Sequence, residues 1–299
     1  MALKAKAPVD VKPSKPKMLI SGESGVGKTF FALDFPKPYL FDTEGGATRE
    51  QYQDKLKKSG GVYFGKKEGS QDFAHVINET KQLCTEKHEY KTAIYDSFTY
   101  LYMLEAAAAE ADKGSEFGRD KKMANIPTRQ LISTLEKLDM NVILICHSKD
   151  KWERKTGQGG KEQIINVGST FDGYDKLEYI LDLWIEILKG GKTFMVRKSR
   201  ITSLVQGNSY PLSYDKFAEL YGKEVLETPS VPVVMANFAQ LTQLGKLIEA
   251  LNISEEQQAK VLKSLDVDKW DETTEDQCQK VIDSLQKKIK DITSTEGKK

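Results

Sequence analysis

The sequence is short of cysteine, of long apolar runs and of net charge, and each shortage excludes a class of protein. Its three cysteines (Cys84, Cys146 and Cys278) form no CxxC or Cys/His zinc spacing, which indicates free thiols in a reducing compartment. Because no apolar run reaches about 18 residues and residues 1–17 lack the apolar stretch of a signal peptide, we expect a cytoplasmic protein without a membrane span. Lys and Arg number 45 against 44 Asp and Glu, so the net charge of +1 excludes a uniformly basic binder but not a local basic groove.

The length and the composition predict one large domain with a smaller one attached. At about 150 residues per domain, 299 residues exceed one small module, and a hydrophobic fraction of 39% allows a buried core. Lysines and prolines dominate the first segment, and the sequence TPSVP at 228–232 has the composition of a linker. We therefore divide the chain into a flexible basic arm (1–16), a core (17–227), a linker (228–236), a helical domain (237–290) and a tail (291–299).

Short apolar segments alternate with segments of helical spacing in the first half of the chain. The helical segments repeat apolar residues every three or four positions, and the last of them has Pro127 near its first turn. This alternation predicts a mostly parallel α/β sheet. The expected strands are 17–21, 39–42, 92–96 and 141–146, and the expected helices are 30–35, 72–87, 98–112 and 126–138.

The pattern changes after His147. Residues 149–170 contain four glycines and little apolar periodicity, so we expect a long functional loop there. Two apolar segments, 183–188 and 193–197, flank a glycine pair and predict a β-hairpin. A short helix is expected at 214–221, followed by C-terminal helices at 237–251, 254–265 and 274–290, with capping boxes at Ser254/Gln257 and Thr274/Gln277.

Residues 22–29, with the sequence GESGVGKT, follow the first expected strand and open the first helix. The pattern G-x-x-x-x-G-K-T in this context is a phosphate loop. Its glycines let backbone N–H groups converge on phosphate oxygens, Lys28 is expected to reach the β- and γ-phosphates, and the Thr29 hydroxyl is expected to bind Mg²⁺. The expected nucleotide-binding residues are Gly22, Glu23, Ser24, Gly25, Val26, Gly27, Lys28 and Thr29, with ATP and Mg²⁺ as cofactors.

Three further strand ends carry polar side chains. Asp96 ends the third strand and is expected to serve Mg²⁺, although an ordinary strand-terminating aspartate has the same pattern. Glu44 follows the second strand, where it either orients a water for attack on the γ-phosphate or stands as a solvated turn carboxylate. His147 ends the fourth strand and either senses the γ-phosphate or is one of the polar residues common at such edges. The expected catalytic residues are Glu44, Lys28 and His147.

The order of these motifs resembles the RecA-type ATPase core over residues 17–205. The phosphate loop comes first, and YLFDTEGG, IYDSFTYL and VILICHS follow it in the order of that family's strand ends. The resemblance implies that Glu44 activates water, that Asp96 forms the Walker B end, and that the residue ending the next strand couples ATP to the DNA loop behind it. His147 takes this last position, where RecA itself has glutamine.

The segment behind His147 lies where RecA-like proteins carry a flexible DNA-binding loop. Residues 149–163 have a net charge of +2 and one tryptophan, which suits phosphate contacts and stacking on single-stranded bases, unless the loop is merely solvated over a packed Trp152. Arg119–Lys122 either occupies the place of that family's first DNA loop or is an ordinary charged loop, and the basic arm can add phosphate contacts. The expected DNA-binding residues are Lys149, Lys151, Trp152, Arg154, Lys155 and Lys161.

The expected strand at 194–200 resembles the strand whose basic residues reach ATP on a neighbouring subunit in RecA-like assemblies. Lys198 and Arg200 occupy the matching positions, and on a strand they share one face. Residues 189–200 hold five basic and no acidic side chains, which also suits a hairpin edge protected by lysine. The resemblance implies a homo-oligomer, a ring or a filament, with Lys198 and Arg200 at ATP on the subunit boundaries.

The compact size, the GESGVGKT and FDTEGG motifs and the amphipathic helical tail resemble a narrower group, the phage-encoded RecA-like ATPases of the Sak-four type, which act as single-strand annealing proteins. The implied fold is a RecA-like P-loop NTPase core with a mostly parallel α/β sheet and a small C-terminal helical domain. The implied function is a DNA-stimulated ATPase that binds single-stranded DNA in phage recombination, by annealing or strand exchange, with a single-strand binding protein as a further partner and no membrane association.

Two other functions are compatible with the same motifs. The alternative is a nucleotide-gated replication loader or adaptor that docks a protein partner through its helical tail. A metabolic P-loop kinase is the third, but it needs a lid with arginines and an acceptor pocket, which the sequence does not offer.

Overall fold

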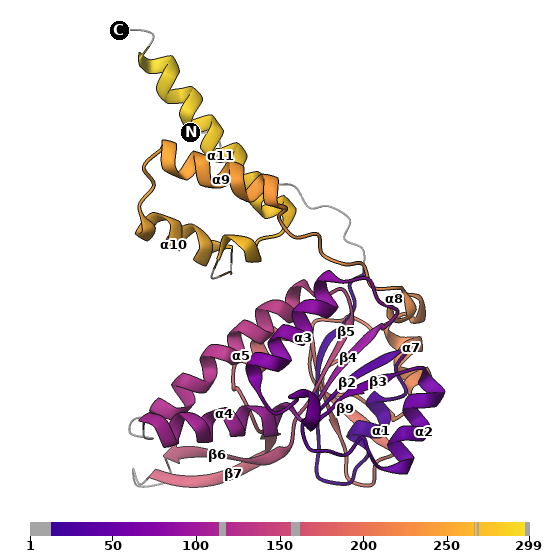
Figure 1. Ribbon diagram of the computed structural model, residues 1–299. Coiled ribbons are helices and arrows are strands. Elements are labelled where there is room, and N and C mark those ends of the chain that lie inside the picture. Colours follow the sequence, from indigo (N-terminus) through magenta and orange to yellow (C-terminus); the bar gives the residue numbers. More distant parts are fainter. Residues whose placement is uncertain (1–12, 114–117, 157–161, 266, 268, 297–299) are drawn as a thin grey trace. The chain divides into compact units, whose positions relative to one another are not determined.

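The computed structural model describes residues 13–113, 118–156, 162–265, 267 and 269–296 (Figure 1). The chain divides into two compact units. Unit 1 consists of the residues up to Lys81 together with His88–Val231, and unit 2 consists of Gln82–Lys87 and the residues from Pro232 onward. Most of the expected basic arm, the expected DNA contact Lys161 and the last residues of the expected tail lie outside the described residues.

Unit 1 is built on an eight-stranded sheet with the strand order β10-β9-β8-β1-β5-β4-β2-β3. Every neighbouring pair from β8 to β3 is parallel, whereas β9 and β10 are antiparallel, so the prediction of a mostly parallel α/β sheet is confirmed. The carboxyl ends of β1, β5, β4 and β2 consequently meet at one edge. The strands are β1 (Lys17–Ser21), β2 (Pro38–Asp42), β3 (Val62–Phe64), β4 (Thr92–Asp96), β5 (Asn141–Ile145), β8 (Leu183–Ile187), β9 (Thr193–Ser199) and β10 (Ser209–Pro211).

Helices cover both faces of this sheet (Figure 1). α3, α4 and α5 lie on one face, and α1, α2 and α7 lie on the other. The sequence patterns missed α2, α6, α8, β3 and β10, which are short or weakly apolar. The helices that lie in unit 1, wholly or for the greater part, are α1 (Lys28–Ala32), α2 (Glu50–Ser59), α3 (Phe73–Thr85, of which unit 1 holds the residues up to Lys81), α4 (Phe98–Lys113), α5 (Arg119–Lys137), α6 (Leu177–Ile180), α7 (Tyr214–Tyr221) and α8 (Lys223–Glu227).

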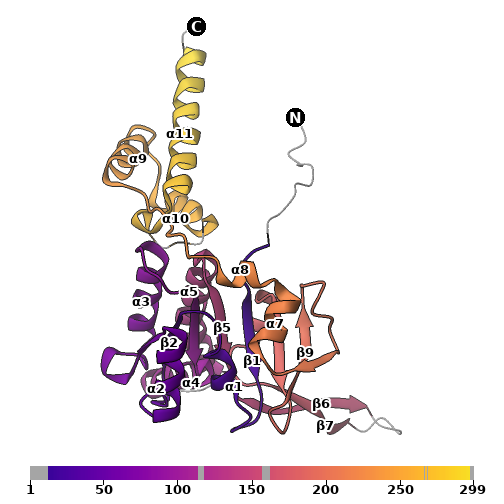
Figure 2. The same cartoon turned by 90° about the vertical axis from the view of Figure 1, so that its right-hand side faces the viewer.

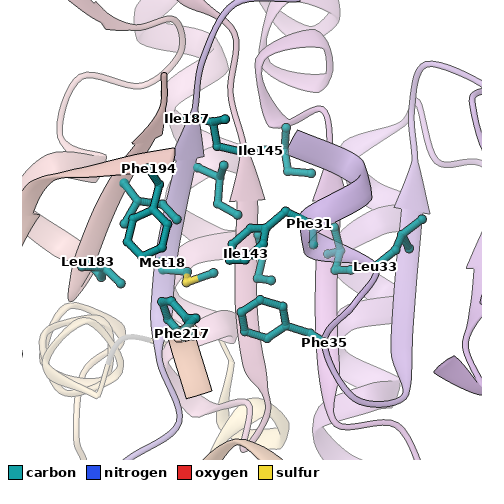
Figure 3. Packing of buried hydrophobic residues seen from close by; sticks show 14 of the residues in the cluster. Met18, Phe31, Leu33, Phe35, Ile143, Ile145, Leu183, Ile187, Phe194 and Phe217 are labelled. Atoms are coloured by element: carbon teal, nitrogen blue, oxygen red, sulfur yellow. The ribbon is translucent and has the colours of Figure 1, made fainter. Parts of the chain in front are cut away.

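The core on the α1 face fixes the helix that follows the phosphate loop (Figure 3). Met18 and Ile20 of β1 point to the same side, where they join a buried cluster that contains Phe31, Phe35 and Phe217. Burial of each large side chain stabilises the fold by roughly 1.5–3 kcal/mol. α1 is therefore held on the sheet through its second half, while its first residue, Lys28, stays at the strand ends.

The expectation of a loop over residues 149–170 is wrong. β6 (Ser148–Thr156) and β7 (Glu162–Phe171) form a separate antiparallel two-stranded sheet that extends away from the core (Figure 2). Both faces of this hairpin are largely solvated, so its strands lack the alternation of apolar and polar residues by which a half-buried strand is recognised. Cross-strand pairing, with a register shift between Asp150 and Trp152, makes the hairpin instead.

The segment Arg119–Lys122 is also not a loop, because α5 begins at Arg119. Pro127 therefore lies inside the helix and not in its first turn. A proline in a helix interior removes one backbone hydrogen bond and costs about 3 kcal/mol. Buried Ala124, Leu131 and Leu135 flank it, and their packing offsets that cost.

Unit 2 is a small helical unit with its own core. Leu244, Cys278, Ile282 and Leu285 are buried together. Both expected capping boxes are confirmed, since Ser254 and Gln257, and likewise Thr274 and Gln277, exchange hydrogen bonds between side chain and backbone. No helix among the described residues is long and apolar enough to cross a membrane. The helices are α9 (Phe238–Ala250), α10 (Glu255–Ser264) and α11 (Glu275–Glu296).

Candidate nucleotide-binding site

The phosphate loop connects β1 to α1 and has the backbone that phosphate binding requires. Gly27, the N-cap of α1, has a φ of 95°, and a Cβ atom there would meet no atom within 4 Å, so this turn faces open space. At Gly22 a Cβ atom would lie 2.9 Å from the Ile187 carbonyl oxygen, so only glycine lets the loop pack against the end of β8.

A polar cavity of about 1160 Å³ opens along this loop. It is lined by every residue from Gly22 to Thr29 and by side chains from the ends of β2, β4 and β5. Ser148 also lines it, and the buried Ser148 hydroxyl has no hydrogen-bond partner among the described residues. A cavity of this volume along a phosphate loop fits a nucleoside triphosphate.

Lys28 lies over the phosphate loop. Its Nζ atom donates hydrogen bonds to the carbonyl oxygens of Gly22 and Glu23, each at 2.8 Å. Burial lowers the pKa of the Lys28 ammonium, and the carboxylates of Asp96 and Glu44 act against this shift. The cation expected at the β- and γ-phosphates is therefore in the cavity, bonded to its own loop.

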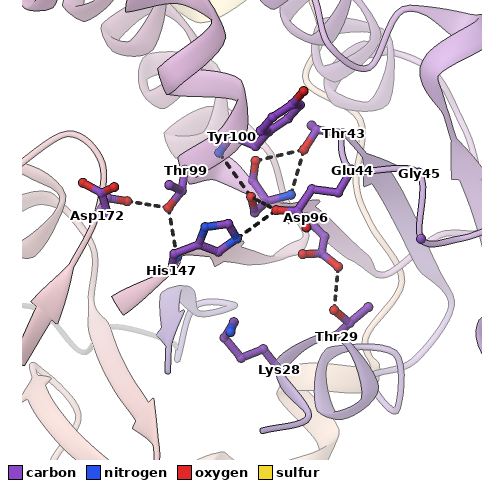
Figure 4. A network of polar contacts seen from close by, with 12 residues as sticks. Lys28, Thr29, Thr43, Glu44, Gly45, Asp96, Thr99, Tyr100, His147 and Asp172 are labelled. Atoms are coloured by element: carbon purple, nitrogen blue, oxygen red, sulfur yellow. Dashed lines mark hydrogen bonds and ion pairs between the residues drawn. The ribbon is translucent and has the colours of Figure 1, made fainter. Parts of the chain in front are cut away.

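Thr29 and Asp96 meet at the end of the cavity nearest β4. The Thr29 hydroxyl donates a 2.6 Å hydrogen bond to Oδ2 of Asp96 (Figure 4). Burial, helped by the nearby carboxylates of Glu44 and Asp42, raises the pKa of Asp96 to about 6, while the Thr29 hydrogen bond and the Lys28 charge act in the opposite direction. A hydroxyl beside a buried carboxylate with a raised pKa fits Mg²⁺, which prefers oxygen ligands and would neutralise phosphate charge when bound.

Glu44 is held by the ends of two other strands (Figure 4). Its Oε1 atom accepts a 2.5 Å hydrogen bond from the Ser97 hydroxyl and lies 2.8 Å from Nε2 of His147. The hydrogen bond with His147 is the main cause that lowers the pKa of Glu44, and the same bond raises the pKa of His147. The structure thus brings together Lys28, Thr29, Glu44, Asp96 and His147, while their catalytic roles stay predictions.

The turn that carries Glu44 is shaped by Asp42, which sequence reasoning did not single out for this purpose. The buried Asp42 carboxylate accepts hydrogen bonds from the backbone N–H groups of Gly45 (2.8 Å), Gly46 (3.0 Å) and Ala47 (2.9 Å). The signal was present in the sequence, because aspartate followed by glycines is typical of such a turn. Ser97, which directly follows Asp96, likewise received no role from sequence reasoning.

Hydrogen bonds continue from the cavity to the β6–β7 hairpin (Figure 4). The His147 backbone N–H donates to the Thr99 hydroxyl at 2.9 Å, and that hydroxyl donates to the Asp172 carbonyl oxygen at 2.5 Å. Asp172 also pairs with Lys149 at 2.9 Å. His147, which lines the cavity, precedes β6. Asp172 follows β7, and its backbone N–H donates to the His147 carbonyl oxygen at 2.8 Å, so the base of the hairpin lies beside the cavity wall. Sequence reasoning missed Thr99.

The hairpin exposes an aromatic and a cationic side chain together. Trp152 is 59% exposed and Ile164 is 64% exposed. Trp152 pairs with Asn166 across the hairpin and Arg154 pairs with Ile164, so these four side chains share one face. Trp152 is therefore not packed under the hairpin. The other described candidates, Lys149, Lys151 and Lys155, are exposed, although the first two form ion pairs with Asp172 and Glu153.

Lys198 and Arg200 lie at the end of the strands opposite to the phosphate loop. Lys198 pairs with Trp184 near the start of β8, whereas the phosphate loop follows the end of the parallel strand β1. Lys198 donates to the Leu181 carbonyl oxygen, and burial lowers its pKa. Arg200 bonds to carbonyl oxygens of α6 and lies 3.7 Å from Asp182. Neither side chain belongs to the nucleotide site of its own chain.

Comparison with protein families places most of the chain in one of them. Residues 14–211, which run from the segment before β1 to the end of β10, match the family described as an AAA domain. No curated protein matches the chain.

Proposed function

The chain belongs to the AAA domain family, and we propose that it is an ATPase which, in addition, binds single-stranded DNA through the β6–β7 hairpin. The observation that carries the proposal is the hydrogen-bonded path from Glu44 through His147 and Thr99 to Asp172, since it joins a phosphate-binding cavity to an exposed aromatic and basic hairpin.

The phosphate loop supports ATP binding. Backbone N–H groups of Gly22–Thr29 bind the phosphates, and Lys28 exchanges its two loop carbonyls for phosphate oxygens. Thr29 and Asp96 hold Mg²⁺, which neutralises charge on the terminal phosphates. The raised pKa of Asp96 supports this assignment, because a cation would relieve the cost of burying that carboxylate.

Glu44 is the group proposed to orient the attacking water. Its lowered pKa keeps the carboxylate ionised at neutral pH, and only Oε1 is engaged by Ser97 and His147. The second carboxylate oxygen can therefore accept a proton from water. Movement of Glu44 as the phosphate leaves would pass to His147 and then to the start of β6.

The hairpin supports single-stranded DNA as the ligand. An exposed tryptophan beside an arginine on one face provides stacking on an unpaired base together with contact to the backbone. Paired bases present no free ring face, so this arrangement favours single strands and reads no particular sequence. The finer proposal is recombination by annealing or strand exchange, as in the phage Sak-four group.

We also propose that the active form is a homo-oligomer. Lys198 and Arg200 lie away from their own phosphate loop, which supports the proposal that they serve the ATP of a neighbour. In such an assembly they would leave the carbonyl oxygens that they contact here and stabilise charge on the γ-phosphate.

The test is the rate of ATP hydrolysis with and without single-stranded DNA. We expect strong stimulation for the wild type, and no hydrolysis and weak nucleotide binding for Lys28→Ala, because the charge at the β- and γ-phosphates is lost. Wild-type turnover in Lys28→Ala contradicts the ATP site. Stimulation by a protein partner but not by DNA identifies the replication loader instead, and consumption of a small phosphate acceptor identifies a kinase.

A further inference from the structure

The β6–β7 hairpin needs side chains to hold it in place. Within the described residues β6 and β7 pair only with each other and form no ladder with the eight-stranded sheet. An isolated two-stranded hairpin is marginally stable in water, and nothing in its own backbone sets its direction relative to the core. The contacts at its base therefore decide where its exposed face points.

Three side chains from three strands form a closed set of hydrogen bonds at this base. Ser169 of β7 donates to Oε1 of Glu186 on β8 at 2.8 Å. Arg197 of β9 donates through Nε to Oε2 of Glu186 at 2.5 Å, and through Nη2 to the Ser169 hydroxyl at 3.1 Å. Glu186 is only 9% exposed, so its charge is compensated by these two partners and not by water.

The direction of the Arg197 side chain comes from an irregularity in β9. The pairing of β8 with β9 shifts between Trp184/Lys198 and Ile185/Val196, which leaves Arg197 without a directly opposite residue. A bulged residue turns its side chain out of the regular alternation. Here the bulge directs the Arg197 guanidinium toward Glu186 and the hairpin, away from the end of the sheet where Lys198 and Arg200 lie.

An apolar contact accompanies the polar one. Phe171, at the end of β7, lies edge-on to Trp184 with ring centroids 5.1 Å apart, and both side chains are buried. The Trp184 indole N–H donates to the Ser21 hydroxyl at 2.8 Å, and Ser21 is the last residue before the phosphate loop. This contact supplies burial, but a ring edge restrains rotation less than a set of directed hydrogen bonds does.

From this geometry we propose that Arg197 and Glu186 are positioning residues for DNA binding: through Ser169 they fix the return strand of the hairpin on the main sheet and so set the direction of the face that carries Trp152 and Arg154. The contribution is to orientation more than to stability, because the attraction within this partly buried ion pair is offset by the cost of desolvating its charges. The inference rests on the proposed DNA-binding function of the hairpin.

The first test removes only the link to the hairpin. Ser169→Ala leaves the Glu186–Arg197 ion pair intact, and Thr170→Ala is the matched control, because Thr170 is the next residue of β7 and no hydrogen bond of its hydroxyl is found within the described residues. Spin labels on Lys58→Cys of α2 and Lys155→Cys of β6 report the hairpin direction, since all three native cysteines are buried. We expect a broadened distance distribution in Ser169→Ala and a narrow one in the control.

The second measurement is affinity for a fluorescent single-stranded oligonucleotide on unlabelled protein. Ser169→Ala should bind about 3- to 10-fold more weakly, because the hairpin must then be ordered on binding, while ATP hydrolysis without DNA stays within about twofold of wild type. Glu186→Leu combined with Arg197→Met should reproduce both effects. It should not lower the thermal stability, because replacing a desolvated ion pair by apolar side chains of similar size is often neutral or stabilising.

A narrow distance distribution and unchanged DNA affinity in Ser169→Ala would overturn the proposal, as would equal effects of Thr170→Ala. The distance measurement needs no DNA. If the wild type fails to bind the oligonucleotide, the proposed function is wrong, while the distance distributions still decide whether this network positions the hairpin.

Discussion

The Nε2 atom of His147 lies 2.8 Å from Oε1 of Glu44, so a residue just after β5 holds the carboxylate that follows β2. Each side chain favours the charged form of the other, which lowers the pKa of Glu44 and raises that of His147. This pair connects Glu44, which is proposed to orient the attacking water, to His147, the residue directly before the hairpin.

Glu44→Gln should slow ATP hydrolysis by about 10²–10⁴-fold, the usual reach of general base catalysis, while nucleotide binding is kept. The amide is isosteric and can still bond to Ser97, but it cannot accept a proton from water. Turnover and nucleotide affinity are measured in parallel, with Asp54→Asn on the exposed surface of α2 as the control. Unchanged turnover would assign the water to another group.

Asp96→Asn should raise the free energy of unfolding in a pH-dependent way. Burial raises the pKa of Asp96 to about 6, above its ordinary value of 3.8, so the folded state favours the protonated carboxyl. That stabilisation is complete below pH 3.8 and is lost as pH rises through 6. We therefore expect the neutral variant to exceed the wild type by on the order of 1–3 kcal/mol at high pH, and by little at low pH.

Urea unfolding of both proteins across this pH range, without nucleotide or Mg²⁺, measures the difference. A difference that does not change with pH would mean that Asp96 titrates normally in the folded protein. Hydrolysis should be lost in Asp96→Asn at every pH, because the carboxylate proposed to serve Mg²⁺ is gone.

Trp152→Ala should weaken binding to single-stranded DNA by about 1–3 kcal/mol, since one stacking platform is removed, and Trp152→Phe should recover part of the loss. Tyr63→Ala is the control, because Tyr63 is a partly exposed aromatic residue on the edge strand β3. Fluorescence anisotropy of a labelled oligonucleotide gives both affinities. An equal loss in the two variants would argue against a specific role for Trp152.

Hydrolysis should rise more steeply than linearly with protein concentration, because Lys198 and Arg200 are proposed to reach ATP across a subunit boundary. The double variant Lys198→Ala with Arg200→Ala should lose this rise and still bind nucleotide. Mixed with Glu44→Gln, it should regain part of the activity at boundaries that combine an intact Glu44 with an intact cation pair. Rates strictly proportional to concentration, with no rescue on mixing, would show a site complete within one chain.

The strand ends could be predicted because their signals are local. A short buried strand followed by Gly22–Thr29, Glu44, Asp96 or His147 is visible in the sequence, and parallel pairing brings such ends to one edge whatever the details of packing. The residues that join them could not be found in this way. Thr99 acts through one hydroxyl on the first turn of α4, where threonine has no distinctive spacing.

The hairpin escaped sequence reasoning for a different physical reason. Alternation of apolar and polar residues arises where one face of a strand is buried. The strands of a solvated hairpin bury too little apolar surface to produce this alternation. The link between Arg197 and Glu186 depends on a one-residue shift in the pairing of β8 with β9, so regular alternation cannot predict which side Arg197 takes. The predicted start of the helix near Pro127 is wrong, because the packing of α5 outweighs the local preference of proline for the first turn.

The contacts of Lys28 with its own loop affect the affinity of the protein for nucleotide. Its ammonium is satisfied by two carbonyl oxygens of the loop that it closes, so an arriving phosphate competes with the protein's own backbone for the same cation. Measured affinity is the difference between these two sets of bonds. When the nucleotide leaves, the Lys28 ammonium can bond again to the same two carbonyl oxygens of the loop. The loop therefore competes with the bound phosphate, which favours release of the product over its tight retention.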